Sequence, residues 1–100
     1  MLGWVDQHQA PAAVDGTVPP GFAAQCRLAW ANVFGVLGEA GMTVRNLAKI
    51  TVYLADRRFR ETNALIAEEI LGGHCPARTV VIAGTDDEAW LLAIEAVAYG

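Results

Sequence analysis

The stretch that decides the fold is Cys75-Pro76-Ala77-Arg78-Thr79-Val80-Val81-Ile82-Ala83, and a second apolar run, residues 90–99, accompanies it at the end of the chain. Both runs predict buried strands, because short apolar runs bounded by turn residues are typical of strands that are covered on both faces. Each run carries one charge, Arg78 in the first and Glu95 in the second. An unpaired charge costs several kcal/mol to bury, so each of these two side chains needs a partner, a ligand or an exposed position.

Length and composition predict a single domain over residues 1–100 that associates with other copies of itself. The chain is 54% hydrophobic and has a net charge of −4. So small a domain exposes much of its surface, and this apolar content favours burial of some of it against another subunit. The short basic cluster Arg57-Arg58-Phe59-Arg60 is interpreted as the solvated start of a helix, and nucleic-acid binding is disfavoured. No apolar run spans a bilayer and no signal peptide is recognisable, so we expect a cytoplasmic protein without a membrane partner.

The first part of the chain predicts a loop followed by a helix. Residues 1–5 have the pattern of a strand fragment, and residues 6–20 are rich in proline and turn residues, which predicts a loop. Apolar residues at helical spacing predict a helix from residue 21 to about residue 40, with Gln25 largely off its apolar face. Gly41 is the expected stop of this helix.

The rest of the chain alternates strands with a second helix. A capped turn at 43–46 leads into a strand over 47–55, in which alternate residues point to opposite faces. Asp56 is the expected N-cap of a helix over 57–71. The apolar stripe of that helix is predicted to comprise Phe59, Leu65, Ile66 and Ile70. The two strands quoted above follow, separated by an acidic turn at 84–88. This order predicts an α+β fold, a mixed β-sheet with two helices packed on one face.

Two charged side chains are the main candidates for chemistry. The guanidinium of Arg78 stands at the mouth of a strand, where a planar fork suits bidentate binding of a substrate carboxylate. The alternative is an internal ion pair, with Glu95 or with the acidic turn at 84–88. Glu95 is a candidate general base or water-holding group, or a structural hydrogen-bond acceptor.

Other polar residues carry weaker signals. Asn63 lies on the second helix, either as ordinary surface or as an amide that locks a loop. His74 and Cys75 are adjacent, and two adjacent ligands do not close a tetrahedral metal site, so no metal is expected.

Several motifs between residues 15 and 99 are similar to those of the RidA/YjgF family. They are Gly21-Phe22-Ala23-Ala24-Gln25, Gly38-Glu39-Ala40-Gly41-Met42, Lys49-Ile50-Thr51-Val52-Tyr53-Leu54-Ala55-Asp56, Asn63, Pro76-Ala77-Arg78-Thr79 and Ile94-Glu95-Ala96-Val97-Ala98. The resemblance implies a chorismate-mutase-like fold and a homotrimer with ligand clefts between subunits. It also implies hydrolysis of reactive enamines and imines, such as 2-aminoacrylate, to a 2-keto acid and ammonia. No metal or organic cofactor is implied.

The resemblance also assigns roles to individual residues. Arg78 matches the arginine that holds the substrate carboxylate, and Asn63 matches a helix asparagine near the cleft. The backbone around Thr79 and Val80 matches the part that orients substrate and water. We therefore predict Arg78 and Glu95 as catalytic residues, and Arg78, Thr79, Val80 and Asn63 as residues that bind a small 2-imino or 2-keto acid.

The chain departs from the family pattern in two ways. The glutamate that is usually linked to the attacking water is Ala93 here, and Glu95 lies on the same face about 6.5 Å further along the strand. The first strand of the family fold, with its tyrosine-containing segment, has no counterpart. Three hypotheses stay open: a RidA-like deaminase, which we favour, a non-catalytic trimeric binding protein for small carboxylates, and a truncated or pseudo-enzyme subunit.

Overall fold

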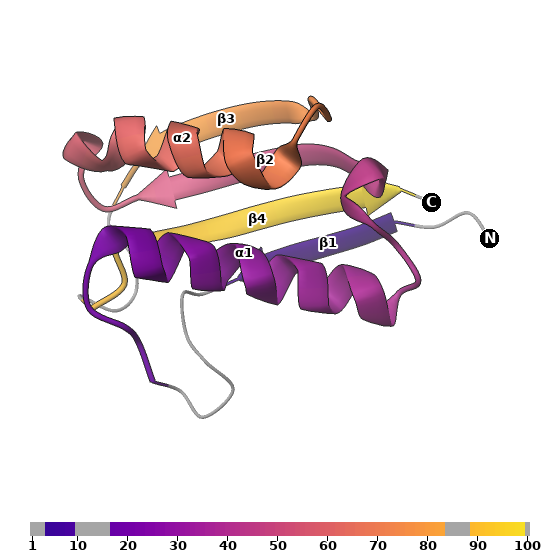
Figure 1. The fold of residues 1–100 in the computed structure, drawn as a ribbon, viewed down its shortest axis with the longest axis horizontal. Helices are drawn as coiled ribbons and strands as arrows, with labels where there is room; N and C mark the ends of the chain where they lie inside the picture. Colours follow the sequence, from indigo (N-terminus) through magenta and orange to yellow (C-terminus); the bar gives the residue numbers. More distant parts are fainter. Residues whose placement is uncertain (1–3, 10–16, 84–88, 100) are drawn as a thin grey trace.

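The computed structural model describes residues 4–9, 17–83 and 89–99. The elements, with η for a 3-10 turn, are β1 (Trp4–Gln9), α1 (Phe22–Glu39), η1 (Val44–Asn46), β2 (Leu47–Leu54), η2 (Arg57–Phe59), α2 (Arg60–Leu71), β3 (Ala77–Ile82) and β4 (Leu92–Tyr99). Both helices lie on one face of the sheet (Figure 1). The predicted α+β class, element order and arrangement of the helices are confirmed. Neither α1 nor α2 is long and apolar enough to cross a membrane.

The sheet is mixed and has the strand order β1-β4-β2-β3. β4 pairs antiparallel with β1 and with β2, whereas β2 and β3 are parallel. A parallel pair needs a crossover connection, and α2 provides it. α2 therefore lies over the β2–β3 part of the sheet, while α1 covers the part nearer β4 (Figure 1).

The register assigns each strand residue to one of the two faces. Ile50 of β2 pairs with Ala96 of β4 and with Arg78 of β3, so these three side chains share the helix-covered face. Thr51, the next residue, pairs with Glu95 and Thr79, which share the other face. The largest fully buried side chains are Trp30, Ile50, Leu54, Leu92, Ile94, Val33 and Cys26, and their burial puts the core between the helices and the sheet.

The end of α1 is fixed by Gly41, as predicted. Gly41 has φ +73°, a left-handed conformation that favours glycine. The N–H of Met42 donates to the carbonyl oxygen of Leu37 at 2.8 Å, and that of Gly41 donates to Gly38 at 3.1 Å. This pair of bonds is the Schellman motif, which satisfies carbonyl groups that the helix end leaves unpaired.

Three sequence predictions are corrected by the structure. The predicted loop over 6–20 gives way to β1 up to Gln9, because residues 6–9 pair with β4. Leu65 is 62% exposed, and α2 turns Asn63 and Ala67 inward instead. β3 is mostly exposed rather than buried, since it is the edge strand and α2 covers it only partly. The predicted acidic turn at 84–88 lies outside the described residues.

Gln25 is a buried polar residue that ties α1 to the segment before β4. Its side chain is 3% exposed. Nε2 donates to the carbonyl oxygens of Pro19 at 3.0 Å and Ala89 at 2.9 Å, while Oε1 accepts from the N–H of Leu91 at 2.9 Å. Sequence analysis predicted that Gln25 lies largely off the apolar face of the helix, and this prediction is wrong. The amide can be buried because backbone groups of two neighbouring segments satisfy its hydrogen bonds.

We expect Gln25→Ala to lower the free energy of unfolding by about 3 kcal/mol, because three part-buried hydrogen bonds to backbone groups are lost. Denaturant unfolding measures this difference. Glu39→Ala, at the exposed end of the same helix, serves as the control and should change stability by less than about 0.5 kcal/mol. Equal effects of the two substitutions would contradict the structural role of the amide.

The two cysteines should differ strongly in reactivity. Cys26 is fully buried, whereas Cys75 is exposed. Burial raises the pKa of Cys26 to about 11, although the nearby charge of Arg27 and the indole of Trp30 lower it in part. Since only the thiolate reacts, iodoacetamide should label Cys75 in the folded protein and Cys26 only after unfolding. Mass spectrometry counts the adducts; two adducts formed at equal rates on the folded chain would contradict the burial of Cys26.

Candidate functional site

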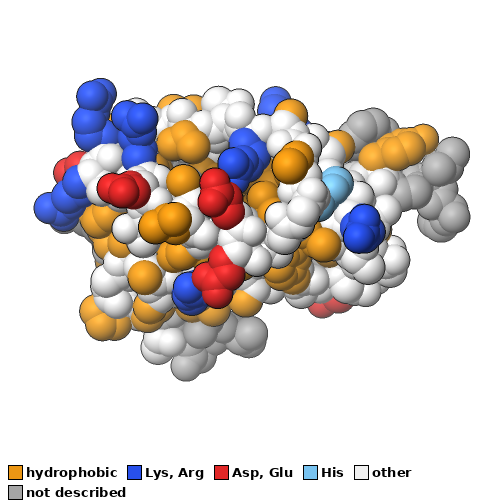
Figure 2. Space-filling view, turned by 45° about the horizontal axis from the view of Figure 1, so that its top comes forward, with side chains coloured by type: hydrophobic (Ala, Val, Ile, Leu, Met, Phe, Trp, Pro, Cys, Tyr) orange, Lys and Arg blue, Asp and Glu red, His pale blue; other side chains and the backbone are white. Residues whose placement is uncertain are grey.

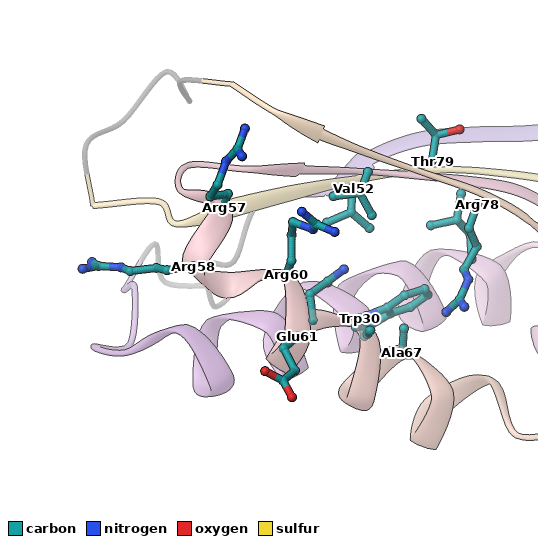
Figure 3. Close-up of a pocket in the computed structure, with 13 residues that line it drawn as sticks. Trp30, Val52, Arg57, Arg58, Arg60, Glu61, Ala67, Arg78 and Thr79 are labelled. Carbon is teal, nitrogen blue, oxygen red and sulfur yellow. The ribbon is translucent and has the colours of Figure 1, made fainter.

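A cleft of about 620 Å³ opens between α2 and the β2–β3 edge of the sheet (Figure 3). Its walls come from α1, β2, η2, α2 and β3. The lining residues are Trp30, Ile50, Val52, Arg57, Arg58, Arg60, Glu61, Asn63, Ala64, Ala67, Arg78, Thr79 and Val80. A site of this size is within the range of cavities that hold small organic ligands.

The cleft exists because of the small side chains that α2 presents to β3. Ala64 and Ala67 line the cleft from the helix, so α2 fills little of the space above the edge strand. Arg78 and Val80 are on the helix-covered face of β3, yet both are exposed. An arginine on this face therefore keeps its charged end in contact with solvent while its stem lies against apolar neighbours.

The floor of the cleft carries buried polar atoms. Asn63 is 3% exposed, and its Oδ1 accepts a hydrogen bond from the Cys26 thiol at 3.8 Å. That bond leaves the N–H groups of Nδ2 available to a ligand. Trp30 is 1% exposed, and its indole Nε1 has no hydrogen-bond partner among the described residues. The indole affects the nearby thiol electrostatically, but the contact does not have hydrogen-bond geometry.

Positive charge dominates the walls. Four arginines and one glutamate line the cleft, which gives its lining a net charge of +3. Figure 2 shows basic side chains crowded at one end of the face that carries α2. Arg58 lies 3.9 Å from Asp56 and stacks on the ring of Phe59 at 4.8 Å. Within residues 17–83 and 89–99, no acidic side chain forms a salt bridge with the three other arginines of the cleft.

The structure brings together all four residues predicted for substrate binding. Arg78, Asn63, Thr79 and Val80 all line the cleft. The Arg78 side chain extends toward Trp30 and α2, whereas the side chain of Thr79 points away, so Thr79 contributes its backbone (Figure 3). β3 forms the edge of the described sheet, and such an edge has unpaired backbone N–H and C=O groups.

Glu95 is not part of this cleft. It pairs with Thr51 and shares the open face of the sheet with Ala93, whereas Arg78 is on the opposite face, two strands away. The internal ion pair between Arg78 and Glu95, one of the alternatives considered for Arg78, is therefore wrong. The other alternative, pairing with the turn at 84–88, lies outside the described residues. The catalytic role of Glu95 stays a prediction.

Three of the lining residues were missed by reasoning from the sequence. Arg57 and Arg60 belong to the basic cluster that was interpreted as a solvated helix start, and the structure places them on the cleft wall. Trp30, which falls within the helix predicted over residues 21–40, was not among the predicted site residues. The density of arginine in a chain of net charge −4 was the available signal for the first two.

Asn63 is neither ordinary surface nor a loop lock, since its bond is to Cys26 of α1. His74 contacts the start of β2: its Nε2 lies 2.8 Å from the carbonyl oxygen of Leu47, within hydrogen-bond distance. Across the described part of the chain, no group of three or more His, Cys, Asp or Glu side chains is placed to hold a metal ion.

Comparisons with known proteins agree with this architecture. The model of one family, described as endoribonuclease L-PSP, matches residues 7–100. No curated protein matches the chain. Among solved structures, the yjgF gene product of E. coli is 29% identical with a TM-score of 0.87, over 95% of this chain and 79% of that one. E. coli TdcF with bound serine is 25% identical with a TM-score of 0.89, over 99% of this chain and 80% of that one.

Yeast Mmf1 has the same fold, with a TM-score of 0.87 at 23% identity over 97% of this chain and 78% of that one. The family model covers nearly the whole chain, and the solved relatives share the sheet and both helices. The chain therefore belongs to the RidA/YjgF family, whose model carries the description endoribonuclease L-PSP.

Proposed function

We propose that this protein is a RidA-like deaminase that hydrolyses reactive enamines and imines to 2-keto acids and ammonia. The observation that carries the proposal is the guanidinium of Arg78, which lines a cleft of about 620 Å³ without an acidic partner among the described residues. A planar guanidinium binds a carboxylate through two parallel hydrogen bonds. The bound serine of E. coli TdcF supports an amino-acid-sized ligand for this fold.

The reaction needs little beyond orientation of the imine and a water molecule. The imine carbon next to the carboxylate accepts the oxygen of water, the carbon–nitrogen bond then breaks, and the nitrogen leaves as ammonia. With the carboxylate on Arg78, this carbon would lie close to the outer edge of β3. The backbone of Thr79 and Val80 and the amide of Asn63 then provide hydrogen-bonding groups for the imine nitrogen and the water.

We propose further that the site is completed in a homotrimer. Val80 and Ile82 on the edge strand are 45% and 41% exposed, and Tyr99 is 42% exposed. Apolar side chains exposed along an edge strand favour association of subunits. Since Glu95 is on the opposite face from Arg78, it would act on a ligand in this cleft only from a second copy of the chain.

A second candidate function is capture of a small carboxylate without turnover. Ala93 favours this second function. It stands where the family usually has the glutamate linked to the attacking water, and an alanine side chain cannot exchange a proton. The activity that the family description names, endoribonuclease, is less well supported: the described residues that line the cleft include no histidine to move a proton, and the chain is acidic overall.

The first test follows pyruvate release from 2-aminoacrylate that is generated enzymatically in the assay. The protein should accelerate release over buffer, and Arg78→Ala should lower the rate about 10- to 100-fold, because a charge-assisted bidentate contact is lost. Arg45→Ala, an exposed arginine outside the cleft, is the matched control and should keep the full rate. If there is no acceleration while 2-ketobutyrate still raises the melting temperature, the binding function holds instead.

The second test measures mass by size exclusion with light scattering. We expect a species of three times the chain mass of 10.7 kDa. Val80→Lys should weaken the assembly by placing a charge in the apolar contact. A monomer at all concentrations would overturn the proposed trimer.

A further inference from the structure

The cleft has positive charge at both of its ends. We propose that it is built for a 2-imino or 2-keto acid that carries a second carboxylate on its side chain. Arg78 binds the carboxylate next to the reacting carbon, and Arg60 with Arg57 binds the distal one. This assignment rests on the proposed function for the first carboxylate and adds the substrate class.

The two ends are separated by the length of the helix wall. Arg60 is the first residue of α2, and Ala67, which lies beside Arg78 in Figure 3, comes seven residues later. Seven residues of α-helix span about 10 Å along the axis. The side chains of Arg60 and Arg78 both extend into the gap between α2 and the sheet, so their charged ends face one open cleft from opposite ends (Figure 3).

Among the described residues, no acidic side chain forms a salt bridge with Arg57 or Arg60 at the distal end. Asp56, which precedes Arg57, interacts with Arg58: its carboxylate accepts a hydrogen bond from the backbone N–H of Arg58 at 2.9 Å, and Nε of Arg58 lies 3.9 Å away. Glu61 is the acidic residue of the lining, and its carboxylate points away from both ends of the cleft in Figure 3. Like charges in one cleft repel each other, and a ligand with a single carboxylate leaves most of that repulsion in place.

The segment that presents the distal arginines is held firmly. Phe59, between Arg57 and Arg60, stacks on Phe22 of α1 with ring centroids 4.6 Å apart and an interplanar angle of 8°. Fixed donors lose less entropy on binding than mobile ones, which favours specific recognition of the second carboxylate.

Equilibrium binding of two acids with equal carbon number tests the proposal. 2-Ketoglutarate and 2-ketovalerate have the same five-carbon chain and differ in the terminal carboxylate. By isothermal titration, the unmodified protein should bind 2-ketoglutarate about tenfold more tightly, as expected for hydrogen bonds to a charged group. The ratio should fall as ionic strength rises, because exposed charges are screened by salt.

Substitutions then show which residues cause the preference for 2-ketoglutarate. The double variant Arg57→Gln/Arg60→Gln should lose the preference and keep its affinity for 2-ketovalerate, which shows that the cleft is intact. Arg60→Lys, which keeps the charge, should retain part of the preference. Arg78→Gln should weaken binding of both acids. Arg45→Gln removes one positive charge outside the cleft and is expected to change neither affinity.

Equal affinities of the unmodified protein for the two acids, or no binding of either, would overturn the proposal. So would a preference that survives in the double variant. Because the measurement needs no turnover, its outcome is distinguishable from failure of the proposed deaminase activity: a protein that releases no pyruvate yet prefers 2-ketoglutarate retains this ligand class as a binding protein.

Discussion

The charge of Arg78 is the constraint on which the rest of the site depends. Its Cα pairs with Ile50, so its side chain is on the face of the sheet that the helices cover. On a central strand this position would bury an unpaired guanidinium, at a cost of several kcal/mol. β3 avoids the cost because it is the edge strand of the described sheet and because α2 presents alanines above it. The same arrangement that makes Arg78 tolerable also leaves a hollow beside it.

The rest of the fold holds this hollow open. α2 is the crossover between two parallel strands, so it must lie over β2 and β3. Its position is fixed from the α1 side by the bond between Asn63 and Cys26 and by the stacked rings of Phe22 and Phe59. Gln25 fixes α1 in turn to the entry of β4. The cleft is thus a consequence of rigid packing around it, which suits a site that must orient a small ligand.

The sequence predicted the elements well because their signals are local. The stop of α1 at Gly41 and the alternation in β2 depend on residues a few positions apart. The exposure of β3 was not predictable in this way, since an apolar run such as Val80-Val81-Ile82 occurs in central and in edge strands alike. The same limit explains Gln25, whose partners Pro19, Ala89 and Leu91 come together only in the folded chain.

Only part of the site was predicted, again because its residues come from segments that are distant in the sequence. The family resemblance identified Arg78 and Asn63, and the fold brings both to one cleft. Glu95 was linked to Arg78 by charge alone, although their strands place them on opposite faces. Arg60 was interpreted as solvated because nothing local shows that the start of α2 borders the cleft. Side chains from distant segments are combined by topology, which single motifs do not encode.

The central claim is that Arg78, which has no acidic partner among the described residues, binds the carboxylate of a small substrate. A crystal structure of the protein with 2-ketobutyrate tests it most directly. We predict that the carboxylate of the ligand accepts two hydrogen bonds from the Arg78 guanidinium inside the cleft between α2 and β3. A guanidinium paired with a carboxylate of the protein itself, with the ligand elsewhere or absent, would contradict the account.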